Sequence, residues 1–386
     1  MRRKYQLLIL VLIFLAGVAV VYFMQQAKQP EPVEPPEEVI VQLPDTVKLL
    51  FVGDIMVHST QFNSARYEGG DTTYNFYPVF QYIEDYIQSA DLAAGNLEVP
   101  FGGEPYSGYP VFSSPKEIAD DLKKAGFDLC LLANNHMVDK GKKGLENTID
   151  HLDQIGMLHT GAFKDTASRN ETYPLIVEVN NLSIAFLNYS YGTNGMPVTA
   201  PNIVNLIDTL QIAKDLATAK ELRADYIITC IHWGAEYQNK EGAHQRKIAQ
   251  YLADHGTDMI VGGHPHVLQP YDEIVSQAGD TVPVAYSLGN FISNQRWRYA
   301  DGAAIFEVIL EKHEGKTRLI STGYEPFWVN RYNDAKGRIV YRVIPVNDYI
   351  KNPEKYELSK NQKDLITQFN EDTRQTLSNL KFSGYY

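Results

Sequence analysis

The stretch HQRKIAQYLADHGTDMIVGGHPHVLQP, residues 244–270, carries most of the information about the fold. Its first half has helical periodicity and stops at Gly256, a residue suited to the C-terminus of a helix. Its second half is a short apolar run that breaks off into Gly-Gly-His-Pro-His. This order predicts a helix followed by a buried strand whose end carries two histidines, His264 and His266.

The same alternation continues on both sides of this stretch. Apolar runs rich in β-branched residues or leucine recur along the chain, and nearly all end abruptly in Gly, Asn, Asp or His. Such runs are typical of strands buried on both faces of a sheet. They begin at residues 47, 91, 128, 182, 226, 258 and 284, and the helical stretches cover 78–90, 115–126, 144–156, 207–224 and 243–256. The pattern predicts an α/β fold whose sheets are covered by helices.

Five of these runs end in side chains that are suited to metal binding. The ends are Gly53-Asp54, Gly95–Glu98, Asn134–His136, His232–Gly234 and Gly263–His266. Ligands gather at the carboxyl ends of strands in α/β sheets, and imidazole, carboxylate and amide groups suit Zn, Mn or Fe. A single histidine after a strand is more often a packed residue than a ligand. Five such ends together predict a metal site, and we expect it to hold two ions.

Composition narrows the class of protein further. The 386 residues carry a net charge of −12, which argues against nucleic-acid binding through a broad basic surface. An anionic substrate remains compatible with this charge, because bound divalent ions reverse the local field. Cys130 and Cys230 lie inside apolar runs and are expected to be buried thiols. Any metal must therefore be held by nitrogen and oxygen ligands.

The N-terminus predicts a membrane anchor. Basic residues at positions 2–4 precede an uncharged apolar run from Leu7 to Met24, which is long enough to span a bilayer. The basic flank is expected to stay in the cytoplasm, with the rest of the chain outside. We therefore expect a signal anchor at residues 1–24 and a Pro- and Glu-rich linker at 25–46. Cleavage of the N-terminal segment would instead give a secreted protein.

The folded part of the chain is expected to begin at residue 47. Residues 47–310 hold the alternation of strands and helices, whereas residues 311–386 suggest antiparallel strands and one closing helix. About 75 residues would make a thin core on their own. We therefore expect residues 311–386 to be an extension packed on the same domain.

The motifs at the strand ends resemble those of the CapA family of poly-gamma-glutamate capsule synthesis proteins, within the calcineurin-like metallophosphatase superfamily. The resemblance runs from residue 47 to residue 346. Besides the 244–270 stretch, it rests on VGDIMVH (52–58), ADLAAGNLEVP (90–100), LANNHMVDKG (132–141), IHWGAEY (231–237) and YSLGNFI (286–292). It implies a metallophosphatase-like, four-layer αββα sandwich with a dinuclear metal site at one edge.

The resemblance also implies a role for each candidate ligand. Asp54 and His266 would bind the first metal, and Asn135, His232 and His264 the second. The superfamily reaction is attack on a phosphorus centre, in which two cations stabilise the entering and leaving oxygens.

Other residues have roles implied by the same resemblance. His136 would give a proton to the leaving group, and Asp139 would orient it. Apart from the resemblance, Ser287 and Asn290 in YSLGNF are candidates for orienting the ligating histidines, although turn formation explains them equally well.

Two positions depart from the wider superfamily. Met56 stands where the superfamily has the histidine of an Asp-x-His motif, and His58 is a nearby candidate of open role. Asn96 replaces the usual bridging aspartate. Asn is a neutral ligand and a poor bridge, so Glu98 is the candidate for that role.

Three functions are compatible with these features. The first is a membrane-anchored, extracytoplasmic hydrolase or transferase that acts in the assembly of a capsule or poly-gamma-glutamate-type surface polymer. The second is an active metallophosphoesterase or nucleotidase. The third is a non-catalytic subunit for polymer binding or export within a capsule-synthesis complex. The expected partners are an anionic surface polymer or a phosphoester, and the membrane, but no nucleic acid.

Overall fold

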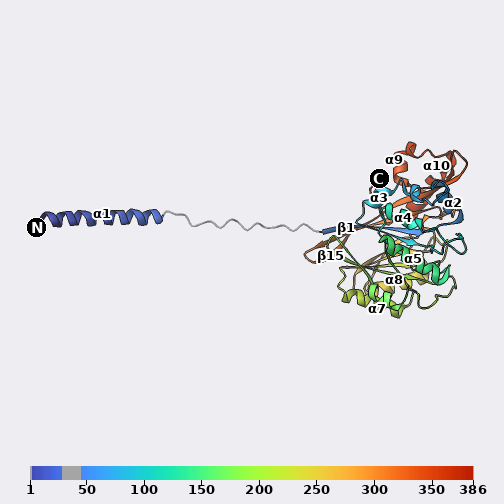
Figure 1. The fold of residues 1–386 in the computed structure, drawn as a ribbon, viewed down its shortest axis with the longest axis horizontal. Coiled ribbons are helices and arrows are strands. Elements are labelled where there is room, and N and C mark those ends of the chain that lie inside the picture. Colours follow the sequence, from blue (N-terminus) through green and yellow to red (C-terminus); the bar gives the residue numbers. More distant parts are fainter. Residues whose placement is uncertain (1, 28–44, 386) are drawn as a thin grey trace. The chain divides into compact units, whose positions relative to one another are not determined.

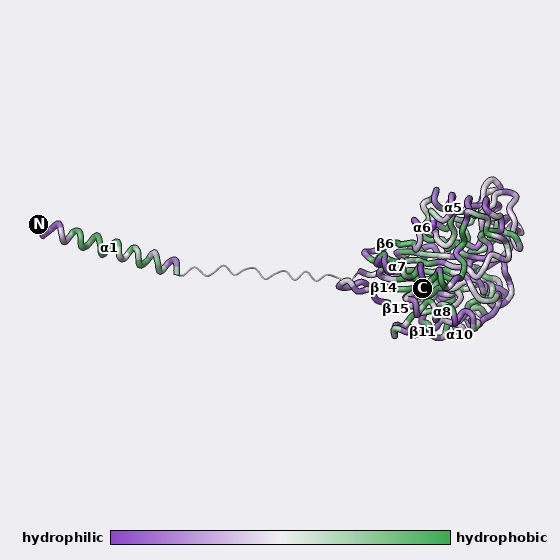
Figure 2. Tube along the Cα trace, turned by 90° about the horizontal axis from the view of Figure 1, so that it is seen from below, coloured by the Kyte–Doolittle hydropathy of each residue, from purple (hydrophilic) through white to green (hydrophobic). Residues whose placement is uncertain are grey.

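The described part of the N-terminal unit is an apolar helix. The computed structural model describes residues 2–27 and 45–385, and the chain divides into units of residues 1–43 and 44–386. Helix α1 (Arg2–Gln26) has no buried residue and is hydrophobic along most of its length (Figures 1 and 2). Within the described residues it is the one helix long and apolar enough to cross a membrane. Residues 28–44, which hold most of the expected linker, lie outside the described residues.

The second unit contains two large sheets, of which the first is mixed. Its parallel part contains β1 (Asp45–Ile55), β2 (Leu92–Leu97), β3 (Leu129–Leu131) and β4 (Leu158–Thr160). Its antiparallel part contains β14 (Gly302–His313), β15 (Lys316–Asn333) and β16 (Ile339–Pro345). Short strands β13 (Asn290–Ile292) and β17 (Lys381–Phe382) pair with β1 and β15. The strand order is β16-β15-β14-β1-β2-β3-β4, so β1 lies at the centre.

The second sheet has a parallel centre and antiparallel edges. The central strands are β7 (Leu182–Ser190), β9 (Tyr226–His232), β10 (Met259–Gly263) and β12 (Thr281–Ala285). The edge strands are β6 (Leu175–Val179) and β11 (Tyr271–Val275). A separate pair is formed by β5 (Ala162–Phe163) and β8 (Ile203–Val204).

Helices cover the outer face of each sheet. On the first sheet these are α2 (Ser59–Glu68), α3 (Glu84–Gln88), α4 (Glu117–Lys124) and α5 (Gly141–Ile155). On the second sheet they are α7 (Thr209–Glu221) and α8 (Ala243–His255). The remaining helical elements are α6 (Thr166–Thr172), α9 (Val346–Lys351), α10 (Lys360–Thr376), η1 (Tyr77–Phe80) and η2 (Pro353–Tyr356). Figure 1 shows α7 and α8 on one side of the strands and α3 and α4 on the other.

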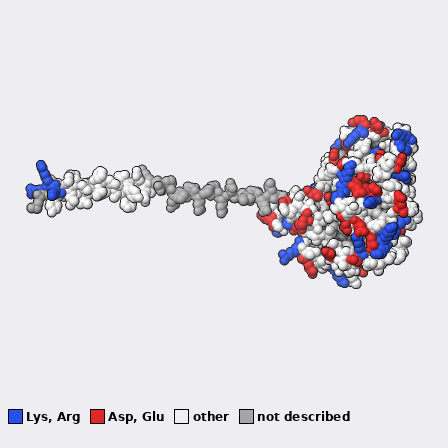
Figure 3. All heavy atoms as spheres, viewed as in Figure 1, with Lys and Arg blue, Asp and Glu red and all other residues white. Residues whose placement is uncertain are grey.

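Three apolar layers hold this arrangement together. One joins the inner faces of the two sheets, where Phe51 of β1 and Phe186 of β7 lie 6.4 Å apart between ring centroids. The other two lie between each sheet and its helices. Helix–sheet–sheet–helix is the expected order, so the predicted α/β class and the four-layer αββα sandwich are confirmed. On the face shown in Figure 3, acidic and basic side chains are intermixed over the domain.

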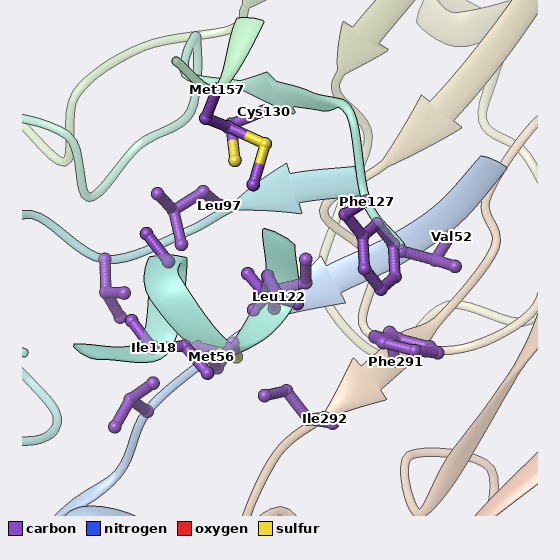
Figure 4. Packing of buried hydrophobic residues seen from close by; sticks show 14 of the residues in the cluster. Val52, Met56, Leu97, Ile118, Leu122, Phe127, Cys130, Met157, Phe291 and Ile292 are labelled. Carbon is purple, nitrogen blue, oxygen red and sulfur yellow. The ribbon is translucent and has the colours of Figure 1, made fainter. Parts of the chain in front are cut away.

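Met56 belongs to the apolar layer beneath α4. It is buried in a cluster that includes Ile118 and Leu122 of α4, and the same layer contains Phe291 (Figure 4). The side chain that replaces the superfamily histidine is therefore a core residue.

The run VAYSLGNF, expected as one strand, is divided between the two sheets. Its first residues belong to β12 in the second sheet, and its last belong to β13 in the first. Residues 286–289 connect the two sheets, and Gly289 has a φ of +76°, which a glycine adopts without steric cost. The prediction of a single strand was wrong, because apolar content alone does not reveal that a chain passes from one sheet to another.

The C-terminal residues complete the first sheet. The expected boundary between residues 310 and 311 falls within β14, and β15 and β16 continue the same sheet. Helix α10 contributes Ile366 and Phe369 to the layer between the sheets. Its Ser359 cap accepts a hydrogen bond from Gln362 N, as a capping box requires.

Glu325 on β15 makes stability depend on pH. Burial raises its pKa from 4.5 to about 7, although its Oε2 accepts hydrogen bonds from Asn347 Nδ2 (3.0 Å) and Ser383 Oγ (3.3 Å). Since its folded pKa exceeds its unfolded pKa, the free energy of unfolding falls as the pH rises from about 4.5 through about 7. Glu325→Gln is expected to raise the free energy of unfolding at pH 8 by up to about 3 kcal/mol and to leave it nearly unchanged at pH 4. Urea denaturation at both pH values measures this, and an equal gain at both would contradict an ionisation effect.

Candidate metal centre

The predicted ligands converge where the carboxyl ends of β1, β2, β9 and β10 meet. Strand register places Asp54 beside Asn96 in the first sheet and His232 beside Gly263 in the second. Loops after these strands bring in the remaining side chains. The structure thus gathers what we call the strand-end cluster: Asp54, Asn96, Glu98, Asn135, His232, His264 and His266, all of them buried.

Asp54, on β1, is a charged side chain that the first sheet contributes to the strand-end cluster. Its Oδ2 lies 3.0 Å from His266 Nδ1, and its Oδ1 accepts a hydrogen bond of 2.8 Å from Asn96 Nδ2. Burial opposes its ionisation, but the hydrogen bond and charge of His266 outweigh burial and hold the pKa of Asp54 well below its usual value. Asp54 is therefore a carboxylate at neutral pH, as a cation ligand must be.

Glu98 lies between the other candidate ligands. Its Oε1 is 3.4 Å from His232 Nε2 and 3.9 Å from His266 Nε2. Ligand atoms of Glu98, Asp54 and His232 lie within 4.8 Å of one another, and so do those of Glu98, His264 and His266. Glu98 therefore belongs to both potential three-ligand groups. Burial, with the charge of Asp54, raises the pKa of Glu98 well above 4.5.

Asn96 is turned so that its amide nitrogen faces the strand-end cluster. The nitrogen donates to Asp54 Oδ1 and to Glu98 Oε2 (3.3 Å), while Oδ1 accepts from Asn134 Nδ2 (3.2 Å). In this orientation its oxygen is already used by Asn134. The geometry therefore leaves an oxygen of Glu98, rather than that of Asn96, available to a cation.

His232 and His264 carry lone pairs that a cation needs. Burial lowers the pKa of His232 to about 3 and that of His264 well below 6.5, so both rings are neutral at physiological pH. His232 Nε2 lies 2.9 Å from Asn135 Oδ1, which brings the predicted partners of the second ion together. Neutral imidazoles of this kind are the usual histidine form in zinc, manganese and iron sites.

Two buried ligand atoms of the strand-end cluster have no hydrogen-bond partner among residues 2–27 and 45–385. They are Glu98 Oε1 and His264 Nδ1. A buried polar atom left unpaired costs about 1–3 kcal/mol unless something binds it. The donor set of nitrogen and oxygen atoms, together with these two free atoms, fits divalent ions of the Mn, Zn or Fe type.

The backbone that carries the two histidines is unusual. His264 and His266 have φ values of +96° and +58°, a conformation that non-glycine residues rarely adopt. Before them, a Cβ added at Gly263 would lie 2.9 Å from Asp54 Oδ1. Strain of this kind is commonly retained at functional sites, where surrounding contacts hold it in place.

His136 and Asp139 form a pair beside the strand-end cluster. His136 Nδ1 lies 2.8 Å from Asp139 Oδ2, and the same oxygen accepts a hydrogen bond of 2.7 Å from Phe112 N. Burial disfavours the protonated ring, but the bond to Asp139 and the charges of Glu98 and Asp139 together outweigh burial and raise the pKa of His136. The Phe112 ring packs edge-on against His136 at 4.7 Å.

His58 lies near this pair without joining the strand-end cluster. Its Nδ1 is 3.1 Å from Gln61 Oε1 and accepts a hydrogen bond from Asn294 N (3.3 Å). Burial lowers its pKa to about 4. These contacts hold its ring at the start of α2 through Nδ1.

Several supporting residues come from positions that the ligand pattern did not mark. Asn188, near the end of β7, accepts a hydrogen bond from Ala133 N (2.7 Å) and donates to Cys230 O (3.2 Å), which ties the two sheets together. The Tyr191 ring packs against the ring of His264 at a tilt of 39°, with 4.4 Å between the ring centroids. An Asn-Tyr pair at the end of an apolar run was the available signal for Asn188.

The two residues considered for orienting the histidines make main-chain contacts around them. Asn290 Nδ2 donates to His266 O (3.2 Å), and Ser287 Oγ donates to Val267 O (2.8 Å). Both contacts hold the backbone around His266 rather than its ring.

Comparisons with known proteins identify the family. The family described as "Bacterial capsule synthesis protein PGA_cap" matches residues 48–295. The chain is 30% identical to the capsule biosynthesis protein CapA of Bacillus anthracis over 355 residues, which is 83% of this chain and 80% of that protein. It is 29% identical to the PGA biosynthesis protein CapA of Bacillus subtilis, covering 70% and 69%. A crystal structure of the calcineurin-like phosphoesterase YfkN from Bacillus subtilis aligns with 87% of this chain and 99% of that one, at 15% identity and a TM-score of 0.46. The first two relatives and the family match confirm the predicted resemblance, and the chain belongs to the PGA_cap family of bacterial capsule synthesis proteins.

Proposed function

We propose that this protein is a metal-dependent hydrolase or transferase in the biosynthesis of a capsule or poly-gamma-glutamate-type surface polymer. Two divalent ions of the Mn, Zn or Fe type would bind at the strand-end cluster, with Glu98 shared between them. The named functions of the two CapA relatives support the pathway. An anionic polymer or a phosphoester is the proposed substrate, handled within a capsule-synthesis complex.

One observation carries the metal-dependent part of this proposal. Carboxylate, amide and imidazole groups from separate strand ends meet in a buried place, and two of their ligand atoms are unpartnered there. Burying several titratable side chains so close together raises the free energy of the folded protein, and a bound cation compensates for this.

The chemistry would divide between cations and protein. Bound divalent ions supply Lewis acidity that stabilises negative charge on reacting oxygens. His136 holds a proton that it can give to a leaving group, and Asp139 fixes its ring through Nδ1. Phe112 covers the ring and limits the access of water to it.

Helix α1 supports a location at the membrane. Its apolar length spans a bilayer, and the basic residues 2–4 favour a cytoplasmic N-terminus with the domain outside. Protease added to intact protoplasts should then digest residues 45–385 and spare α1. Complete protection of the domain would reverse the orientation.

His136→Ala tests the proposed reaction. We expect the variant to keep its metal and its fold but to lower turnover of a chromogenic phosphodiester by about 10²- to 10⁴-fold, because the proton donor is gone. In cells it should abolish surface polymer at an unchanged protein level. The control is His255→Ala, whose ring lies in α8 and contacts Tyr251 O.

The same pair of readouts separates the other functions. Phosphodiester turnover that depends on His136, with polymer unaffected, favours the phosphoesterase, for which the His136–Asp139 pair is the supporting observation. Intact polymer in His136→Ala combined with polymer loss when His264 and His266 are both replaced by Ala indicates a non-catalytic subunit. Unchanged polymer in both variants contradicts the proposal.

A further inference from the structure

The carboxyl end of β7 also lies beside the strand-end cluster. Its last residue, Ser190, pairs with His232 of β9, and Tyr191 N donates a hydrogen bond of 2.9 Å to His232 O. The chain continues as residues 191–196, which we call the 191–196 loop. One side chain of this loop contacts Asn135, a proposed ligand of the second ion.

That side chain is Asn194, whose oxygen accepts two hydrogen bonds. Its Oδ1 accepts from Asn135 Nδ2 (3.2 Å) and from the Tyr191 hydroxyl (3.1 Å). On its other side, the Asn135 amide presents Oδ1 to His232 Nε2 at 2.9 Å. Asn135 is completely buried, whereas Asn194 and Tyr191 are exposed. The bond therefore connects a loop at the protein surface with a buried ligand of the strand-end cluster.

The direction of the Asn135 amide matters for a cation. An amide has an accepting oxygen and a donating nitrogen at positions of nearly the same shape, and the oxygen is the atom that binds a metal ion. If the group were turned over, its NH₂ would face His232 and repel the ion. An acceptor held next to the nitrogen opposes that turn, and Asn194 Oδ1 occupies this place. Partners of this kind, outside the ligands themselves, commonly change metal affinity by about 10- to 100-fold.

Asn194 also suits the turn on which it lies. Thr193 O accepts a hydrogen bond from Met196 N (2.8 Å), and Asn194 and Gly195 between them have φ values of +51° and +73°. Asn-Gly is a favoured pair at the centre of such a type I′ turn, because both residues tolerate positive φ. Turn formation alone would explain an asparagine here, but a glycine would serve the turn equally well. The contact with Asn135 is what the side chain adds.

We propose that Asn194 is a positioning residue of the metal centre, which holds the Asn135 amide so that its oxygen, and not its nitrogen, is available to the second ion. Tyr191 holds Asn194 in turn through its hydroxyl, and its ring packs against His264. The 191–196 loop thus supports two proposed ligands of one ion. This assignment rests on the proposed function, because it requires an ion at the strand-end cluster.

Glycine at position 194 separates the two roles of this residue. Asn194→Gly keeps a residue that tolerates positive φ but removes the oxygen next to Asn135. The metal-free, full-length protein in detergent is titrated with Mn²⁺. We expect Asn194→Gly to lower the affinity for Mn²⁺ by about 10- to 100-fold at one site and to leave the free energy of unfolding in EDTA nearly unchanged.

The conservative variant should rescue the binding. Asn194→Asp keeps an acceptor at the same place, and a carboxylate has no nitrogen that could face Asn135 instead. It should therefore bind Mn²⁺ at least as tightly as the wild-type protein. Unchanged affinity in Asn194→Gly, or equal losses in the Asp and Gly variants, would overturn the proposal.

A double-mutant cycle tests whether Asn194 acts through Asn135. Asn135→Ala should itself weaken Mn²⁺ binding, and Asn194→Gly should then cost no further affinity, because its partner amide is gone. Independent losses that multiply in the double variant would contradict the assignment. The matched control is Asn181→Gly, at a φ of +64° in the turn that precedes β7, which should leave the affinity for Mn²⁺ unchanged.

The outcomes distinguish this inference from the proposed function. Full metal affinity in Asn194→Gly, together with loss of metal when His264 and His266 are both replaced by Ala, would overturn the role of Asn194 alone. Absence of metal binding by the wild-type protein would contradict the metal-dependent function and the role of Asn194 with it. Since Mn²⁺ binding is measured without a substrate, the result does not depend on which reaction the protein catalyses.

Discussion

Replacing both His264 and His266 by alanine is expected to weaken binding of divalent metal by at least about 100-fold. The two rings and Glu98 form one of the two potential three-ligand groups, and His266 also contacts Asp54 of the other. Their loss leaves that three-ligand group with the carboxyl group of Glu98 and without an imidazole. Elemental analysis of the purified full-length protein, followed by titration with Mn and Zn, measures the change.

The matched control for this variant is His159→Ala. His159 lies on β4 outside the strand-end cluster, with Nε2 2.9 Å from Asp153 Oδ1. Its removal should leave metal content unchanged. Full metal occupancy in the double variant would place the ions elsewhere and remove the strand-end cluster from the mechanism.

Gly53→Ala is expected to lower the free energy of unfolding by at least about 3 kcal/mol. A Cβ at this position would lie 1.9 Å from Gly289 O and 2.9 Å from Gly289 C, and backbone atoms cannot move aside as a flexible side chain can. The same oxygen accepts a hydrogen bond of 2.9 Å from Asp54 N. The substitution should therefore displace Asp54 as well as destabilise the sheet. Urea denaturation and metal titration measure the two effects.

Gly192→Ala provides the comparison. No atom lies within 4 Å of the Cβ that this change would add, so its effect should stay within about 1 kcal/mol. Similar losses in the two variants would show that close backbone approach is not what Gly53 provides.

The position of the candidate site at strand ends was predictable, because the carboxyl ends of parallel strands lie along the same edge of a sheet. An apolar run that stops at Asp54 or His232 places that side chain at the carboxyl end of a strand, and such ends meet. All seven candidate ligands, with His136 and Asp139, were named from this pattern and from the family resemblance. Their convergence is visible in the structure, while their individual roles remain proposals.

Features that depend on long-range contacts were not predictable. The helix expected over residues 78–90 is divided into η1 and α3. Asp121 of α4 accepts hydrogen bonds from the backbone nitrogens of Phe76 and Tyr77 and so holds the start of η1, a contact that no local pattern reveals. The passage of residues 286–289 between sheets depends on partners far along the chain. Likewise, no local pattern indicates that Asn96 turns its nitrogen toward Asp54.

The pairing of β1 with β14 has a consequence for how the protein is made. Val47 pairs with Leu310, so the central strand of the first sheet, although β2 follows it early in the chain, lacks its neighbour on the other side until most of the chain has been synthesised. Until then one edge of β1 exposes unpaired backbone groups that attract other strands. Distant pairings of this kind also slow folding. With the domain outside the membrane, as proposed above, a chain exported in the order of its synthesis would cross the membrane before this domain can close, and would need protection from aggregation on the far side until residue 310 arrives.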